Sequence, residues 1–237
     1  MPQNKITILS TKEIDQAFID EAAERNIIVE ISPFIKTEPI RSIETQQEIE
    51  LALIESITVV FTSVNAVEAV ATELLDLKPD WKIYCIGYTT KQAAEKYFGN
   101  NSVKGIADNA KALAELMIEE AEADEVFFFC GDQHRKELPG ALRKNGIETI
   151  EIIVYQTILL PHKIEKNYNG ILFFSPTAAT AFFQKNKPGD QTILFAIGDT
   201  TANEIKKYSS NKTIVSDEPL KKSLLAKAID FFEQIHH

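Results

Sequence analysis

Short apolar stretches alternate with amphipathic stretches along the whole chain. The apolar stretches have the length of strands, and the amphipathic ones carry apolar residues at helical spacing. Strands are predicted at Ile6–Leu9, Ile27–Ile31, Thr58–Thr62, Lys82–Ile86, around Val103, and at Val126–Cys130, Glu148–Tyr155, Ile171–Phe174, Thr192–Ile197 and Thr213–Val215. Helices are predicted at Glu13–Arg25, Glu44–Leu53, Val64–Leu75, Lys91–Phe98, Ala110–Glu122, Lys136–Asn145, Thr177–Lys185, Ala202–Tyr208 and Lys221–Gln234. This alternation predicts an α/β protein with parallel sheets.

Two motifs occur twice in the chain, in the same order. Val60–Ala66 (VFTSVNA) corresponds to Phe173–Ala178 (FFSPTA). Downstream, Ile83–Thr90 (IYCIGYTT) corresponds to Leu194–Thr201 (LFAIGDTT) at almost the same spacing. Such a repeat predicts two related α/β units.

A fainter likeness joins Ile6–Pro33 to Val126–Tyr155, each a strand, a helix and a strand. The simplest arrangement is a discontinuous lobe of residues 1–34 and 159–237, an inserted lobe of residues 41–152, and linkers at 35–40 and 153–158. Each lobe is expected to be flavodoxin-like or Rossmann-like. Because ligands bind outside the carboxyl edge of parallel sheets, we expect a cleft where the two edges face each other.

The charge of the chain limits its partners. Its 237 residues carry a net charge of −10, which is the wrong sign for holding phosphate backbones, so no nucleic-acid partner is expected. No apolar run approaches the roughly 18 residues of a membrane span, and the N-terminus lacks a secretory apolar region. Cys85 and Cys130 lie in apolar stretches without metal-ligand spacing. We therefore expect a cytoplasmic protein with buried thiols, no metal and no membrane partner.

Hydroxyl side chains stand where strands lead into helices in both repeats. Ser63 and Ser175 occupy one such corner, and Thr89, Thr90, Thr200 and Thr201 occupy the other. Their simplest role is helix capping, and Thr89–Gln92 and Thr201–Glu204 have the spacing of a capping box. The alternative is a ligand site, because helix N-termini bind carboxylates through free N–H groups without any lysine. The two roles are compatible.

Other corner residues suggest a bound anion more weakly. Gly87 and Gly198 permit a tight turn, but no Gly-x-Gly-x-x-Gly or Walker-type loop is present, which disfavours a nucleotide. The turn after the strand at Val126–Cys130 is either a solvated helix start or places Arg135 or Lys136 near a substrate carboxylate. Lys12 occupies the equivalent turn of the first strand–helix–strand unit. His134 ranks low as a general base because no partner is placed for it.

Tyr155 ends an apolar strand where the chain enters the second linker. It is either a core tyrosine whose hydroxyl bonds to backbone or a phenol that donates a hydrogen bond or proton to a leaving oxygen.

Taken together, these motifs resemble the uroporphyrinogen-III synthase family. The matching segments lie in the family's order and span nearly the whole chain. They are Val60–Val67, Ile86–Thr90, Gly131–Leu138, Gly146–Thr157, Phe174–Ala178 and Ile197–Ala202. No single segment is specific to this family, but the whole set is.

The resemblance implies a monomeric lyase of tetrapyrrole (haem) biosynthesis with two α/β lobes joined by a two-stranded connector. Such enzymes convert hydroxymethylbilane to uroporphyrinogen III without a cofactor or metal, losing water and inverting ring D. By position, Tyr155 would be the catalytic connector tyrosine, and Ser63, Thr90, Ser175 and Thr201 would line the cleft. Hand-over of the substrate from hydroxymethylbilane synthase is a further expectation. The rival interpretation is a two-lobed small-molecule binding or sensor protein without turnover.

The chain also departs from the family pattern. Ser10–Glu13 replaces the usual Thr-Arg-Pro, Asn26 replaces a glycine, and Cys130 replaces a frequent arginine. No fixed role for a basic residue at these corners therefore follows from the resemblance.

Overall fold

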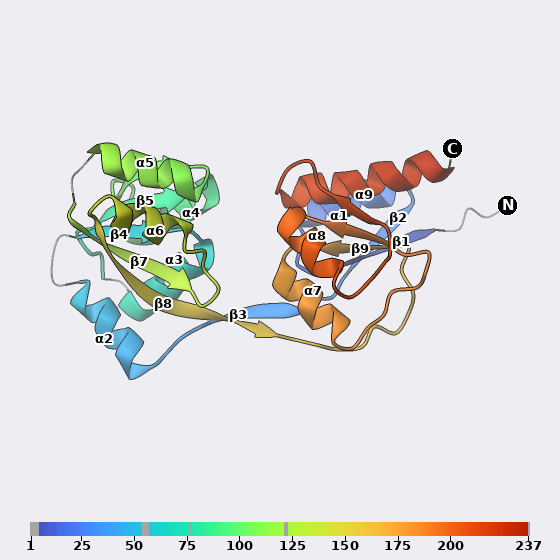
Figure 1. Ribbon diagram of the computed structural model, residues 1–237, viewed down its shortest axis with the longest axis horizontal. Coiled ribbons are helices and arrows are strands. Elements are labelled where there is room, and N and C mark those ends of the chain that lie inside the picture. Colours follow the sequence, from blue (N-terminus) through green and yellow to red (C-terminus); the bar gives the residue numbers. More distant parts are fainter. Residues whose placement is uncertain (1–4, 54–56, 76, 121–122, 237) are drawn as a thin grey trace. The chain divides into compact units, whose positions relative to one another are not determined.

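The computed structural model describes residues 5–53, 57–75, 77–120 and 123–236. These residues divide into two compact units: unit 1 comprises Met1–Lys36 and Ile158–His237, and unit 2 comprises Thr37–Thr157 (Figure 1). Both divisions fall inside the segments 35–40 and 153–158, where the sequence predicts linkers.

Unit 1 contains a five-stranded sheet in the order β11-β10-β9-β1-β2, and the strand pairs in it are parallel. Its strands are β1 (Ile6–Ser10), β2 (Ile27–Ile31), β9 (Gly170–Phe173), β10 (Ile193–Ala196) and β11 (Thr213–Val215). Its helices are α1 (Gln16–Glu24), α7 (Pro176–Phe183), α8 (Asp199–Ile205) and α9 (Lys221–His236).

Unit 2 contains a six-stranded sheet in the order β3-β8-β7-β4-β5-β6. Its strands are β3 (Ile35–Pro39), β4 (Thr58–Phe61), β5 (Lys82–Ile86), β6 (Val103–Ala107), β7 (Glu125–Gly131) and β8 (Glu148–Leu159). The first two residues of β3 and the last two of β8 belong to unit 1. Its helices are α2 (Ile43–Leu51), α3 (Val64–Leu74), α4 (Tyr88–Phe98), α5 (Ala110–Glu120) and α6 (Glu137–Lys144). The pairs from β8 through β6 are parallel.

The two units have the same strand order with a different chain order. Strands β11, β10, β9, β1 and β2 of unit 1 correspond to β6, β5, β4, β7 and β8 of unit 2. In unit 1 the strand–helix–strand segment β1-α1-β2 comes first in the chain, whereas its counterpart β7-α6-β8 comes last. The two units are thus circularly permuted versions of one strand order. Both ends of the chain contribute to unit 1.

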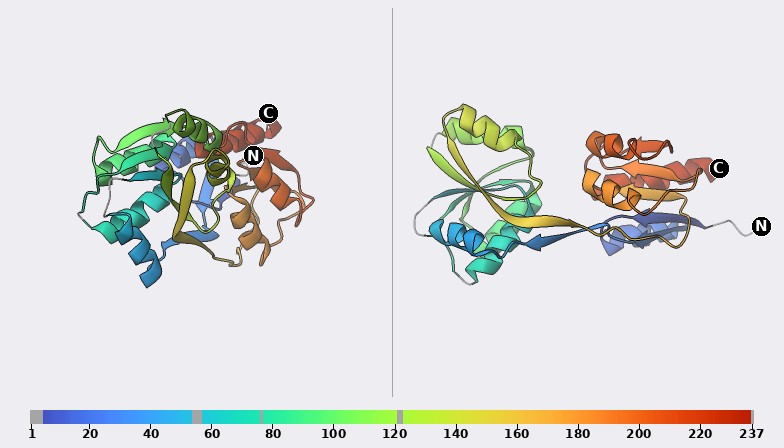
Figure 2. Two further views of the ribbon diagram at one scale, coloured as in Figure 1. Left: turned by 60° about the vertical axis from the view of Figure 1, so that its left-hand side comes forward. Right: turned by 60° about the horizontal axis from the view of Figure 1, so that its bottom comes forward.

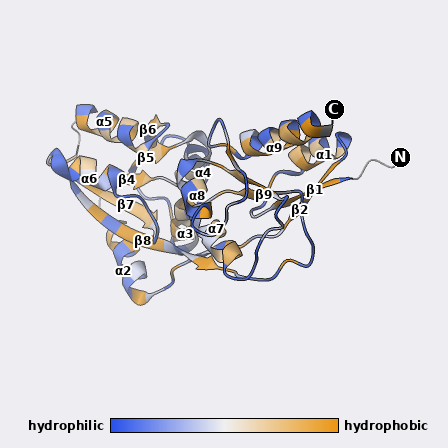
Figure 3. Ribbon diagram, turned by 45° about the vertical axis from the view of Figure 1, so that its right-hand side comes forward, coloured by the Kyte–Doolittle hydropathy of each residue, from blue (hydrophilic) through white to orange (hydrophobic). Residues whose placement is uncertain are grey.

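Each sheet is covered by helices on both faces (Figures 1 and 2). In unit 2, Val59 and Phe61 face the cluster formed with α3 and α4, while Val60 faces the cluster formed with α5 and α6. In unit 1, Leu172 packs toward α9 and Phe173 toward α7. Hydrophobic positions are frequent on the strands, and hydrophobic and hydrophilic positions alternate along the helices (Figure 3). Burial on both faces explains why these strands are almost wholly apolar.

The connecting segments are more regular than their polar sequence suggests. β8 continues to Leu159, past the predicted end at Tyr155, and β3 is its neighbour in the sheet. Leu160 N–H donates to Phe34 O (2.8 Å) and Ile40 N–H donates to Val154 O (2.9 Å), as antiparallel pairing requires. Pairing with a second strand supplies backbone partners, which allows a polar segment to remain extended.

Asn26 adopts the conformation that a glycine would supply. Its φ is 59°, and the corresponding Gly146 after α6 has φ 84°. Asparagine tolerates this left-handed region better than other non-glycine residues, so the helix-to-strand turn is kept.

Candidate active site

The predicted site residues lie at the carboxyl edges of the two sheets, one group in each unit. In unit 2, Ser63, Gly87 and Arg135 follow β4, β5 and β7. In unit 1, Lys12, Ser175 and Gly198 follow β1, β9 and β10. Parallel strands end at one edge, so residues far apart in the sequence come together in each unit.

Ser63 and Ser175 cap helices in the same way. Ser63 is the N-cap of α3 and its Oγ accepts from Ala66 N–H at 3.2 Å, while Ser175 caps α7 and accepts from Ala178 N–H at 3.1 Å. Both serines have extended backbones, as N-cap residues require. The capping prediction is confirmed for these two residues.

The capping prediction is wrong for the threonines. The N-caps of α4 and α8 are Gly87 and Gly198, and each helix begins three residues earlier than predicted. Thr89, Thr90, Thr200 and Thr201 therefore lie in the first helical turn, where the proposed capping boxes cannot form. Thr90 and Thr201 are buried, at 3% and 2% exposed, whereas Thr89 and Thr200 are exposed.

The two corner glycines differ. Gly87 has φ 80°, a conformation that disfavours any side chain. Gly198 has φ −176°, ordinary extended backbone, and a Cβ there would meet no heavy atom within 4 Å. Of these two corners, the one at Gly87 requires the positive φ that glycine allows, and the one at Gly198 does not.

Tyr155 lies on β8 with its phenol directed to the start of α3. Ser63 Oγ donates to the phenol oxygen at 3.2 Å, and Tyr155 packs against the hydrophobic cluster under α3. Because the phenol oxygen acts as acceptor in this bond, its own hydrogen is left for another acceptor. A phenol held in this way at a sheet edge is suited to donate to a ligand oxygen.

Gly131 lies directly against the phenol of Tyr155. A Cβ built on Gly131 would be 2.4 Å from Tyr155 Cζ and 2.7 Å from its hydroxyl oxygen. The pairing of β7 with β8 shifts between Cys130 and Gly131, so that Gly131 pairs with Tyr155. Such a bulge changes the direction of a side chain. Sequence reasoning missed this contact, because nothing in the apolar pattern marks the shift.

The basic candidates are less constrained. Arg135 is exposed, and no ion pair joins it to another described residue. Lys12 is exposed at the corner after β1, yet desolvation by the surrounding protein and the nearby charge of Lys221 lower its pKa. Both side chains are available to an anionic ligand.

His134 is engaged by protein groups on both sides of its ring. Nδ1 lies 2.8 Å from Gly131 O, and Nε2 contacts the Glu151 carboxylate. Glu151 is thus a carboxylate partner that the sequence did not place. Both ring nitrogens are engaged, whereas a general base needs a free one.

The cysteines are not reactive groups. Cys85 and Cys130 are buried, and burial raises the pKa of each thiol to about 12.

One hollow of unit 2 borders Tyr155. It has a volume of about 210 Å³ and is lined by Thr37–Pro39, Asn65, Glu68, Ala69, Thr72 and Tyr155. Glu38 and Glu68 make this wall acidic, so it does not suit a carboxylate.

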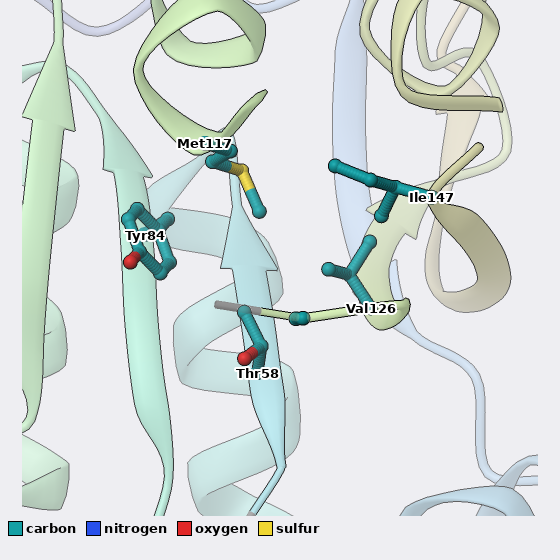
Figure 4. Close-up of a pocket in the computed structure, with 6 residues that line it drawn as sticks. Thr58, Tyr84, Met117, Val126 and Ile147 are labelled. Carbon is teal, nitrogen blue, oxygen red and sulfur yellow. The ribbon is translucent and has the colours of Figure 1, made fainter. Parts of the chain in front are cut away.

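Two further hollows lie at the opposite, amino edge of the unit 2 sheet. An open one of about 500 Å³ surrounds Lys82 and Asn100. Another, between Thr58, Tyr84, Met117, Val126 and Ile147, is a packing gap of about 10 Å³, close to the smallest volume that holds one water (Figure 4). Neither hollow is lined by a predicted site residue.

Among the helices that the structure describes, none combines the length and apolar character needed to cross a bilayer.

Comparisons with known proteins agree on one family. The sequence profile of uroporphyrinogen-III synthase HemD matches residues 16–226. The chain is similar in structure to uroporphyrinogen-III synthetase from Helicobacter pylori, with TM-score 0.67, 16% identity, and coverage of 95% of this chain and 99% of that one. It is also similar to a mutant uroporphyrinogen III synthase from the extremely thermophilic bacterium Thermus thermophilus, with TM-score 0.65, 14% identity, and coverage of 97% and 99%. No curated protein matches the sequence at a significant level.

Proposed function

The chain belongs to the uroporphyrinogen-III synthase family of cyclising lyases, which act on hydroxymethylbilane in haem biosynthesis, and we propose that Tyr155 assists loss of the hydroxyl group in this reaction. The observation that carries the proposal is the bond from Ser63 Oγ to the phenol oxygen, which leaves the phenol hydrogen for the substrate.

The proposed loss of water and closure of the ring need few protein groups. The terminal pyrrole nitrogen supplies the electron pair, the carbon–oxygen bond of the hydroxymethyl group breaks, and the oxygen leaves as water with the proton donated by Tyr155. The carbon then bonds to the substituted α-carbon of ring D, and the bond from that α-carbon to its bridging methylene breaks. The methylene bonds instead to the other α-carbon of ring D, which closes the macrocycle with ring D inverted. The proton lost from that second α-carbon balances the one that Tyr155 donated. Because the pyrrole expels the hydroxyl, the phenol needs to supply only modest acid assistance, and the larger task is to hold a flexible chain in a curled shape.

The strand-to-helix corners are proposed to bind the substrate carboxylates. Their backbone N–H groups in the first turns of α3 and α4 are free of helical partners, which suits a polyanion bound by a protein of charge −10. We propose that the exposed hydroxyls of Thr89 and Thr200 contact substrate directly. We assign the buried Thr90 and Thr201 to support of the corners.

The remaining contacts are proposed at Gly87, Ser175, Gly198, Arg135 and Lys12. The two basic residues add charge where a carboxylate arrives. Arg135→Ala and Lys12→Ala are each expected to raise KM several-fold with kcat nearly unchanged. The reason is that each variant loses a contact that binds the substrate and the transition state equally well.

The product isomer tests the proposed function. The purified protein is supplied with hydroxymethylbilane, and the products are oxidised and separated as type I and type III isomers. We expect mainly the type III isomer. Formation of only the type I isomer, as without enzyme, would contradict the assignment.

We also propose that the enzyme is a cytoplasmic monomer that receives hydroxymethylbilane from its synthase. Hydroxymethylbilane that is free in solution cyclises to the type I isomer without an enzyme. Rapid transfer between the two enzymes would therefore keep the yield of the type III isomer high. Sedimentation at micromolar concentration checks the monomer, and a chase with unlabelled hydroxymethylbilane during a coupled assay checks the transfer.

A further inference from the structure

The turn after β7 holds Tyr155 from two sides. Asp132 N–H donates to Tyr155 O at 3.0 Å, and Asp132 Oδ1 accepts from Thr157 N–H at 3.0 Å. Gly131 lies against the phenol itself. Any movement of residues 131–134 would therefore shift both the backbone and the ring of Tyr155.

His134 fastens this turn to the strand that carries Tyr155. Its backbone N–H donates to Gly131 O at 3.1 Å, and its ring Nδ1 lies 2.8 Å from the same oxygen. On the other side, ring Nε2 contacts the carboxylate of Glu151 on β8. The His134 side chain is only 7% exposed and meets Phe128 edge-on, with ring centroids 5.5 Å apart.

The contacts of the ring join the turn to Glu151. A carbonyl oxygen can only accept a hydrogen bond, so ring Nδ1 donates to Gly131 O, while ring Nε2 faces the Glu151 carboxylate. Burial opposes the charge of Glu151, but hydrogen bonds from Lys136, His134 and Arg143 outweigh burial and lower its pKa to about 2. The His134 ring thus bridges Glu151 and the turn.

We propose that His134 is a positioning residue that holds the turn at residues 131–134 against Tyr155, so that the phenol keeps its place beside Ser63. This inference rests on the proposed role of Tyr155 and adds the device that orients it. Sequence alone ranks His134 as a weak candidate base, whereas the contacts assign it a role through Gly131.

A double-mutant cycle tests the inference. We measure kcat and the type III fraction for wild type, His134→Ala, Tyr155→Phe and the double variant. His134→Ala is expected to lower kcat about 10-fold in the wild-type background and less than about 2-fold in the Tyr155→Phe background, because coupled residues are not additive. Equal fold losses in both backgrounds would overturn the inference while leaving the role of Tyr155 intact. Unchanged kcat in Tyr155→Phe would overturn both.

Two additional variants separate positioning from folding. Arg143→Ala removes another bond to Glu151, made by a side chain that is 48% exposed, without touching Gly131, and it is expected to keep wild-type kcat. His134→Gln retains one donor and is expected to give a kcat between those of wild type and His134→Ala. Thermal unfolding of each variant identifies any loss of folded protein, and kcat is calculated per folded enzyme. An equal loss in Arg143→Ala and His134→Ala would contradict the positioning role.

Discussion

At the residue scale, the central pair is Tyr155 and Ser63. Ser63 Oγ accepts from the α3 backbone and donates to the phenol, so one hydroxyl both caps a helix and contacts the proposed acid. A cap of this kind stabilises a helix by roughly 1 kcal/mol in addition to its effect on the phenol.

Tyr155→Phe removes the proposed proton donor and keeps the ring. Because the pyrrole itself drives departure of the hydroxyl, the loss should lie at or below the lower end of general acid contributions, which is about 100-fold in kcat. KM should change little. Steady-state kinetics with hydroxymethylbilane measure both constants. An unchanged kcat would remove Tyr155 from the mechanism and leave the family assignment intact.

Ser63→Ala and Ser175→Ala form a matched pair. Each removes an N-cap bond of the same kind, so each should lower the free energy of unfolding by about 1 kcal/mol. Ser63→Ala also deprives the Tyr155 phenol of its partner and should lower kcat more than Ser175→Ala. Urea unfolding and kcat are measured on both variants. Equal kcat values would mean that the bond from Ser63 to Tyr155 does not matter for turnover.

Glu151 should make stability depend on acid pH. Its pKa is lowered from the ordinary 4.5 to about 2, so its contribution is complete above pH 4.5 and is lost as the pH falls toward 2. Urea unfolding of wild type and Glu151→Gln between these pH values should show a fall in stability for wild type that is smaller in the variant. If the free energy of unfolding falls equally with pH in wild type and in Glu151→Gln, the ion pairs of Glu151 do not stabilise the fold.

At the element scale, the bulge where β7 pairs with β8 decides where Tyr155 points. The register shift brings Gly131 opposite Tyr155, and the absence of a side chain on Gly131 leaves room for the phenol. The sequence feature behind this contact is a single glycine at a strand end.

Gly131→Ala and Gly140→Ala test this arrangement. The new methyl group at Gly131 would overlap the Tyr155 ring, so both kcat and stability should fall, with a stability loss of about 1–3 kcal/mol. At Gly140, within α6, the methyl group meets nothing within 4 Å, and helix propensity should raise stability by up to about 1 kcal/mol with kcat unchanged. Thermal unfolding and kinetics distinguish the two variants. A harmless Gly131→Ala would mean that Tyr155 has space that the structure does not show.

At the scale of the whole molecule, each unit has its own core on both faces of its sheet. A fragment of residues 37–157 should therefore unfold cooperatively on its own. It should form no type III product, because it lacks the unit 1 corners at Lys12, Ser175 and Gly198, which are proposed to bind substrate. Circular dichroism on heating and product analysis check the two expectations. A fragment without a cooperative transition would show that unit 2 depends on unit 1 for folding.

Local pattern was enough to predict the α/β class, most strand and helix bounds, and the duplicated units. These follow from periodicity and repetition, which can be read along the chain without knowing the fold. Position at predicted strand ends also singled out Ser63, Ser175 and Tyr155, although β8 continues past Tyr155 to Leu159. The predicted threonine caps were wrong because backbone turns at Gly87 and Gly198 start the helices early.

Which side chains meet, in contrast, could be learned from the folded chain alone. Ser63 and Tyr155 are 92 positions apart, and their bond depends on strand order and on the register shift between β7 and β8. The bridge from Glu151 through His134 to Gly131 likewise joins a strand to a distant turn. Apolar periodicity specifies which residues are buried, but it carries no information on register or on the partners of polar side chains, because these are set by the packing of several elements at once.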